Sequence, residues 1–332
     1  MTTMLDPRSL LRAISTLMYG CNRGSFILAE DWDHLLILDN CRHDLFSKVF
    51  KKYFKQKMRN AKINFECRIS RGASTFEFIY ENFVNDYFTS EHYKDVIYIS
   101  ANPVVDYALG AYRNKFFKYV AVWQYFWNKR LGTVHPSDVY IVSLKYFIKY
   151  PKKRLIIHFL QPHPPFIDKR FSHLNKYVKF DYFCSKETFR ANKCLKHEAL
   201  RLLNIITMNI KTVLSRAAIS SLPGLYFNAS LIEITKAFYS NLRYVLPYVL
   251  RLVNILPGIN VITTDHGEAF GEYIHPLLPI RVYAHPSYIH IESLVKVPWI
   301  IFDNRNLSLH ESLKIALKDF LAMRVKRLNN YF

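Results

Sequence analysis

Short apolar runs alternate with helical segments along most of this chain, and this alternation constrains the fold more than any other feature. Seven runs have the length and the β-branched and aromatic content of strands. They are residues 34–39, 62–70, 95–102, 118–125, 154–161, 259–264 and 297–303. Helical periodicity is clearest in 136–150 and 308–328. We therefore predict an α/β fold, with a mainly parallel central sheet covered by helices on both faces.

The 332 residues are predicted to form one domain. Half of them are hydrophobic, which suffices for a large core and excludes a disordered chain. The stretch from about 168 to 256, between the fifth and sixth runs, is mostly helical by its period. We expect it to be a helical insertion within a single domain that spans residues 1–332.

The chain is strongly basic, with 46 Lys and Arg against 26 Asp and Glu. A net charge of +20 attracts anions, whether nucleic acid, an anionic membrane surface, or phosphate and sulfate esters. Lysines are densest in residues 46–62, where apolar residues follow helical spacing. We interpret this run as a surface helix with its aromatic face on the core. The alternative is a helix that binds a membrane surface or nucleic acid.

The cysteines and the N-terminal segment indicate the cellular compartment of the protein. The five cysteines match no zinc-binding spacing, and their odd number argues against a complete disulfide framework. No signal peptide and no apolar span of about 20 residues is recognisable. We expect a cytoplasmic protein, with peripheral contact to an anionic membrane left open.

Polar residues follow several of the predicted strands. Asp39 ends the first, and Asp265 and His266 end the sixth, just before Gly267, which permits a turn. Parallel strands bring their carboxyl ends to one edge of a sheet, where ligands bind. Carboxylate and imidazole groups are metal ligands. The simpler alternatives are a helix cap at Asp39 and a solvated turn at Asp265.

Hydroxyl and imidazole groups are expected at the same edge. Ser74 and Thr75 open a helix after the second strand, where a hydroxyl beside a metal would be an activated nucleophile. Either could instead serve only as a helix cap. His163 follows the fifth strand and His285 precedes the last. Each histidine alone is compatible with an ordinary loop residue, and the joint pattern favours a metal site.

Six segments together resemble a known family. They are LILDNCRHDLF, SRGASTFEFIYENF, IYISANP, IIHFLQPHPPF, VITTDHGEAFGE and YAHP with LVKVPWI. In this order they resemble the archaeal sulfatase-like proteins of the alkaline phosphatase superfamily, over roughly residues 35–302. The resemblance implies an alkaline-phosphatase-like fold. It also implies a metal-dependent hydrolase or transferase of phosphate or sulfate esters.

The resemblance further implies roles for individual residues. Asp39, Asp265 and His266 would bind one metal. The nucleophile would be Thr75, by the G-x-x-T spacing of related phosphoethanolamine transferases, with Ser74 as the alternative. His163 and His285 would serve a second metal, or the leaving group and substrate oxygens. Arg42 and Arg71 are close in sequence to the site and would hold an oxyanion. The cofactor would be one or two divalent ions, Zn²⁺ or Mn²⁺ in preference to Ca²⁺.

The chain departs from true sulfatases in two places. It lacks the Cys/Ser-x-Pro-x-Arg signature that yields formylglycine, and it has Asp-His where such enzymes tend to have Asp-Asn. We therefore predict phosphoester chemistry, with sulfuric ester hydrolysis as the alternative. A second alternative is an inactive basic protein that binds nucleic acid or anionic lipid. The expected substrate is a small-molecule, lipid-linked or glycan anionic ester, and nucleic acid is disfavoured.

Overall fold

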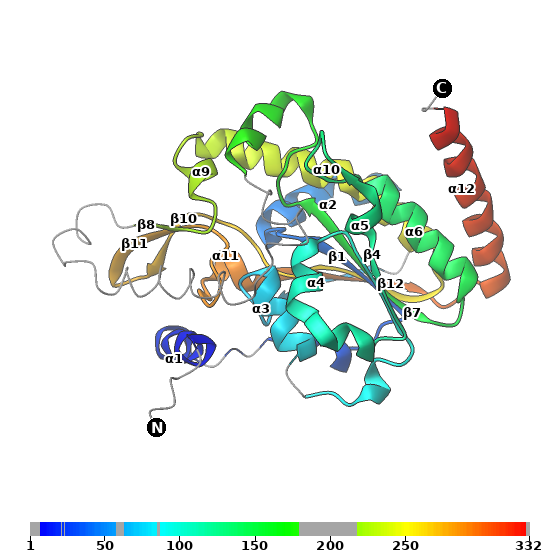
Figure 1. The fold of residues 1–332 in the computed structure, drawn as a ribbon, viewed down its shortest axis with the longest axis horizontal. Coiled ribbons are helices and arrows are strands. Elements are labelled where there is room, and N and C mark those ends of the chain that lie inside the picture. Colours follow the sequence, from blue (N-terminus) through cyan, green and yellow to red (C-terminus); the bar gives the residue numbers. More distant parts are fainter. Residues whose placement is uncertain are drawn as a thin grey trace.

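A central seven-stranded sheet organises the chain (Figure 1). The computed structural model describes residues 7–20, 22, 24–57, 63–84, 87–178 and 218–329. The strand order is β2 (Ile63–Ile69), β12 (Lys296–Asn304), β9 (Gly258–Thr264), β1 (His34–Asp39), β7 (Arg154–Pro162), β3 (Val96–Ser100) and β4 (Lys118–Ala121). Within it β12 runs antiparallel to both neighbours, and the other neighbouring pairs are parallel.

Helices cover both faces of this sheet, as the alternation of β1 side chains requires. Leu36 and Leu38 point into a core shared with the larger helices. These are α2 (His43–Lys57), α6 (Pro136–Lys149), α10 (Leu231–Ile255) and α12 (Leu309–Asn329). Leu35 and Ile37 point the other way, toward α3 (Thr75–Ile79) and α4 (Pro103–Leu109). The predicted α/β fold, with a mainly parallel sheet covered on both faces, is confirmed.

Shorter elements complete the described part of the chain. The helices among them are α1 (Pro7–Tyr19), α5 (Val122–Phe126), α9 (Pro223–Tyr226) and α11 (Glu292–Val295). The 3₁₀ and π segments are Ile27–Ala29, Tyr80–Val84, Ser90–His92, Gly110–Lys115 and Lys169–Tyr177. None of the helices in the described ranges is both long and apolar enough to cross a bilayer.

Three parts of the strand prediction need correction. The run 118–125 is a strand only as far as Ala121, because its partner β3 ends at the paired residue Ser100, and the chain then enters α5. A second sheet was not predicted. It consists of β10 (Ala269–His275) paired with β11 (Leu278–Ala284), to which β8 (Ala218–Ser220) adds. A minor two-stranded pair, β5 (Trp127–Asn128) with β6 (Thr133–Val134), was also missed.

The structure describes only part of the basic run 46–62 and of the expected helical insertion 168–256. The run 46–62 is helical through Lys57, with Phe46 and Val49 buried in the core, and residues 58–62 lie outside the described residues. Of the stretch 168–256, residues 179–217 lie outside the description. Its longest described element, α10, packs on β7 and contributes to the same core as the sheet.

Candidate active site

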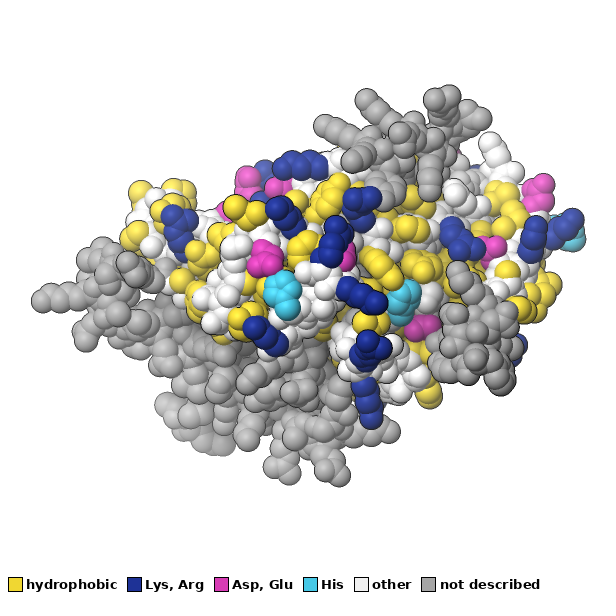
Figure 2. Space-filling model, turned by 90° about the horizontal axis from the view of Figure 1, so that it is seen from above, with side chains coloured by type: hydrophobic (Ala, Val, Ile, Leu, Met, Phe, Trp, Pro, Cys, Tyr) yellow, Lys and Arg dark blue, Asp and Glu magenta, His cyan; other side chains and the backbone are white. Residues whose placement is uncertain are grey.

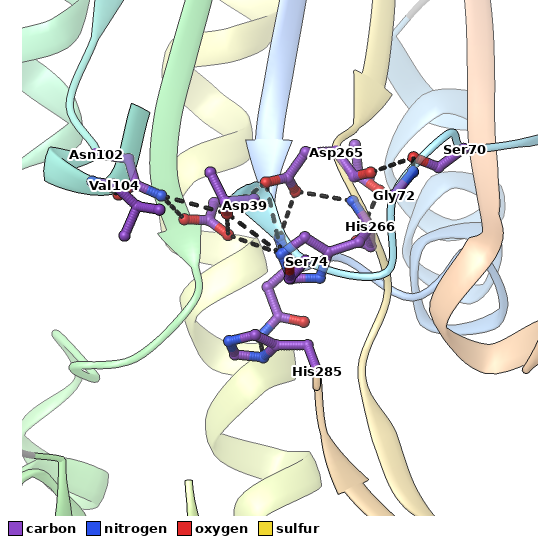
Figure 3. Close-up of polar contacts among 12 residues, drawn as sticks. Asp39, Ser70, Gly72, Ser74, Asn102, Val104, Asp265, His266 and His285 are labelled. Carbon is purple, nitrogen blue, oxygen red and sulfur yellow. Dashed lines mark hydrogen bonds and ion pairs between the residues drawn. The ribbon is translucent and has the colours of Figure 1, made fainter. Parts of the chain in front are cut away.

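Two adjacent strands bring the predicted ligands together. Because β1 and β9 are parallel neighbours, with Leu38 opposite Thr264, Asp39 and Asp265 leave the sheet at the same edge. Ligand atoms of Asp39, Asp265 and His266 all lie within 4.8 Å of one another, and the three side chains are fully buried (Figure 3). The geometry matches the expected metal site. Metal binding itself stays a prediction.

The two hydroxyl groups at the start of α3 have different surroundings. Thr75 Oγ1 lies 2.7 Å from Asp265 Oδ2, and 3.3 Å from both Asp39 Oδ1 and His266 Nε2. Ser74 Oγ instead lies 2.6 Å from Ser287 Oγ and accepts from the backbone N–H of Glu77. Ser74 is thus the N-cap of α3. Thr75 is the hydroxyl that faces the carboxylates.

The buried carboxylates are held largely by neutral donors. Asn102 Nδ2 donates to Asp39 Oδ2 at 2.5 Å, and Asp265 Oδ1 accepts from the backbone N–H groups of Asn40 (3.0 Å) and His266 (2.8 Å). In the described part of the chain, no Lys or Arg forms an ion pair with either carboxylate, and the nearest basic groups are histidines. A bound cation would supply the missing positive charge.

Their environment separates the pKa values of the two carboxyl groups. Burial and the neighbouring Asp265 charge raise the pKa of Asp39 well above its usual range. Burial acts in the same direction on Asp265, but His266, His158 and the Thr75 hydroxyl outweigh it, so the pKa of Asp265 is lowered. Without a metal, the pair therefore favours one proton on Asp39 and none on Asp265.

Two side chains that contact the carboxylates were not predicted from the sequence. His158, within β7, is fully buried; its Nδ1 lies 2.9 Å from the Tyr98 hydroxyl. Its Nε2 lies 3.6 Å from Asp265 Oδ2, too far for a hydrogen bond, and has no other partner among the described residues. Asn102, which holds Asp39, follows β3 just as Asp265 follows β9. Asn102 thus occupies the same kind of strand-end position as Asp265.

The two predicted loop histidines lie beside this group. The ring of His285 is 4.8 Å from that of His266 and 5.1 Å from that of His163, centroid to centroid. Burial lowers the pKa of His163 to about 3 and that of His285 to about 4, so both are neutral near pH 7. Their proximity fits the expectation, and their role at a second metal stays a prediction.

A buried glutamate, which was not predicted, orients His285. Glu268 Oε2 lies 2.7 Å from His285 Nδ1, and Tyr226 donates its hydroxyl to the other oxygen. Asn40 Nδ2 lies 3.2 Å from the same imidazole nitrogen. With Nδ1 engaged in this way, the Nε2 side of the ring is the one left to act on a ligand. The DHGE segment thus contributes Glu268 in addition to its Asp-His pair.

The two predicted arginines are engaged in other contacts. Arg42 pairs with Asp44 (2.9 Å) and Glu272 (2.5 Å) and donates to the carbonyl of Glu268. Arg71 donates to the carbonyl of Gly24 and lies over the Phe26 ring, 3.7 Å from its centroid. Proximity in sequence did not fix the direction of either side chain. Their role in holding an oxyanion stays a prediction that these contacts do not support.

Comparisons with known proteins identify structural neighbours. No family model and no curated protein sequence matches this chain. It is similar in structure to the integral membrane lipooligosaccharide phosphoethanolamine transferase A of Neisseria meningitidis, with a TM-score of 0.50 and 14% identity over 83% of this chain and 49% of that one. The soluble domain of the same protein gives a TM-score of 0.49 at 13% identity, covering 82% and 76% of the two chains. The C-terminal periplasmic domain of EptC from Escherichia coli gives 0.46 at 13% identity, covering 87% and 77%.

The integral membrane transferase bears on the fold of this chain and not on its activity. The chain spans about half the length of the integral membrane transferase that it resembles. Identities of this order carry no assignment of substrate. The fold predicted from the sequence, that of alkaline-phosphatase-like domains, is thereby confirmed.

Proposed function

We propose that this protein is a metal-dependent phosphoester transferase or hydrolase with Thr75 as its nucleophile. The observation that carries the proposal is the position of Thr75 Oγ1, within 3.3 Å of ligand atoms from Asp39, Asp265 and His266. One hydrogen bond would satisfy the buried Thr75 hydroxyl, so the structure alone does not require contacts with two carboxylates and an imidazole. The same arrangement suits an activated nucleophile.

The residues present fit a divalent cation. Two buried carboxylates lack a Lys or Arg partner among the described residues, and the buried Nε2 of His158 points toward them without a hydrogen bond. Asp39, Asp265 and His266 would hold the ion, and their oxygen and nitrogen donors suit Zn²⁺ or Mn²⁺. When bound, the ion would lower the pKa of the Thr75 hydroxyl and neutralise charge on the phosphoryl oxygens.

The chain's own residues account for the other requirements of the reaction. Asp265 Oδ2, 2.7 Å from Thr75 Oγ1, accepts the hydrogen bond of this hydroxyl and so orients the nucleophile. Asn102 fixes the orientation of Asp39 through a 2.5 Å hydrogen bond. His163 and His285 are neutral near pH 7, and Nδ1 of each contacts an oxygen, the Pro164 carbonyl for His163 and the Glu268 carboxyl for His285. Each ring therefore presents the lone pair of Nε2, which can accept a hydrogen bond from the acceptor substrate or bind a second metal.

Phosphate is favoured over sulfate by the nature of the nucleophile. A covalent phosphothreonine can be attacked by water or another acceptor. A sulfated threonine lacks the elimination route that formylglycine provides, and this chain has no formylglycine signature at that position. A phosphate monoester also carries more charge than a sulfate ester, which suits a basic protein. The name of the neighbouring transferase, which specifies lipooligosaccharide, supports lipid-linked or glycan esters as the substrate class.

Thr75→Ala and Ser74→Ala form a matched pair for testing this function. Metal content and turnover of aryl phosphate, phosphodiester and sulfate esters would be measured for wild type and both variants. We expect phosphoester turnover to exceed sulfate turnover. Thr75→Ala should nearly abolish it while metal still binds, whereas Ser74→Ala should lose less, through a weakened cap. Dominant sulfatase activity would refute the substrate assignment. Full activity in Thr75→Ala would refute the nucleophile.

A further inference from the structure

A groove of about 680 Å³ lies between the edge strand β4 with the following α5, the helix α6 and the C-terminal helix α12. It is on the side of the sheet where α6 and α12 pack. Its volume falls in the range of pockets that bind small organic molecules. The described residues that line it include none of the proposed catalytic group.

The floor and sides of this groove are apolar. Val122, Ile141 and Val142 are at most 8% exposed and belong to the core beneath it. Phe126 and Phe320 add partly buried rings at the sides. Among its described lining residues there is no Asp, Glu, Asn or Gln. A peptide or a carbohydrate would therefore find few side-chain partners for its polar groups, whereas an alkyl chain needs none.

Two cationic side chains border the apolar surface. Lys145 lies one turn after Ile141 on α6. Arg324 lies one turn after Phe320 on α12, with its guanidinium carbon 5.8 Å from the centroid of the Phe320 ring. Both cations are exposed, and neither is in an ion pair with a carboxylate in the described part of the chain. The groove thus combines an apolar interior with a positive border.

Exposed cations alone do not define a binding site on so basic a chain. Figure 2 shows Lys and Arg side chains spread over one face of the molecule, with hydrophobic side chains between them. The groove differs because its two cations come from different helices and border a single hollow, together with Tyr125 and Tyr146. A ligand with an anionic end and an apolar chain matches both features, through ion pairs at the border and burial of the chain.

We propose that this groove binds a free long-chain fatty acid. The alkyl chain would lie over Val122 and Ile141, with the carboxylate between Lys145 and Arg324. A guanidinium group can pair with both oxygens of a carboxylate, which suits this end of the ligand. The inference goes beyond the proposed function, because the ligand has no phosphoester and the groove does not require Thr75 or a metal.

Calorimetric titration with octanoate, decanoate and dodecanoate, each below its micellar concentration, tests the proposal. Each added methylene should tighten binding about fourfold while the groove accommodates the chain. Decanol and decyltrimethylammonium have a chain of the same length without the negative charge, and should bind at least about tenfold more weakly than decanoate. Lys145→Ala with Arg324→Ala should weaken decanoate binding at least about tenfold and leave decanol binding unchanged.

Two controls separate the groove from the general charge of the protein. Lys314→Ala with Lys318→Ala removes two exposed charges from α12 outside the groove, and should leave decanoate binding unchanged. Lys145→Arg with Arg324→Lys keeps both charges and should retain most of the affinity. Melting curves establish that all the variants are folded.

Four outcomes would overturn the proposal. They are equal loss of affinity in the two double-alanine variants, decanol binding as tightly as decanoate, affinity independent of chain length, and decanoate binding only when phosphatidylcholine vesicles are present. Thr75→Ala should bind decanoate as wild type does. Failure of the catalytic function would therefore leave the groove intact, and failure of the groove would leave the catalytic function intact.

Discussion

Acid should destabilise this protein through His34 in a way that one substitution reveals. His34 begins β1, is 3% exposed and packs edge-on against Phe147. Burial, with a smaller effect of Arg154, lowers its pKa to about 3. An unfolded histidine has a pKa of about 6.5. Between these values the unfolded chain binds a proton that the folded chain rejects, so the free energy of unfolding falls as the pH falls.

The magnitude follows from the two pKa values. Each pH unit below the unfolded pKa costs about 1.4 kcal/mol until the folded pKa is reached. Between about pH 7 and about pH 5, His34 alone should therefore remove about 2 kcal/mol of stability. Other buried histidines add to the wild-type slope, so the informative quantity is the difference between wild type and His34→Leu.

Urea unfolding of both proteins at a series of pH values measures that difference. His34→Leu changes packing at every pH, but its stability should decline less steeply toward acid, by about 2 kcal/mol over this interval. A substitution at the exposed His310 of α12, His310→Leu, serves as the control and should keep the wild-type slope. Parallel curves for wild type and His34→Leu would refute the conclusion that His34 is neutral because it is buried.

Three further predictions concern the candidate site. Asn102→Ala removes the donor to Asp39 and should weaken Zn²⁺ binding about 10- to 100-fold in a metal titration, with Asn102→Asp, which loses the amide donor, no better. A chelator should lower the Tm of metal-loaded wild type. The loss in free energy of unfolding should be about 2.7 kcal/mol if the ion was present at about a hundred times its Kd. The Tm of Asp265→Ala should not change. Gly267→Ala would place a methyl group 2.0 Å from the carbonyl oxygen of Ser293. This clash should destabilise the fold and reduce the metal affinity of the neighbouring His266. Normal affinity would show that the backbone adjusts freely at this position.

The sequence was most informative where one physical rule determined the structure. Buried strands such as β1 and β9 are recognisable because both faces are covered and most of their central residues are aliphatic or β-branched. Their carboxyl ends then located Asp39, Asp265 and His266. Asn102 follows the buried strand β3 in the same way, so it too can be predicted from the sequence.

Other features depended on contacts that no local pattern encodes. His158 lies within an apolar run, and its importance follows from the neighbouring position of β7 beside β1, which only the topology supplies. The strand β4 ends where its partner ends, although its own residues continue to favour a strand. Arg42 is near Asp39 in sequence but turns to Glu272, from the second sheet, which the sequence reading did not include.

The amide of Asn241 joins two parts of the structure that could otherwise move separately. It donates from the buried side of α10 to the carbonyls of Pro162, His163 and Pro165, so the order of this helix supports the order of the loop that carries His163. Asn241→Ala would remove the donor to these carbonyls and let the loop open independently of α10.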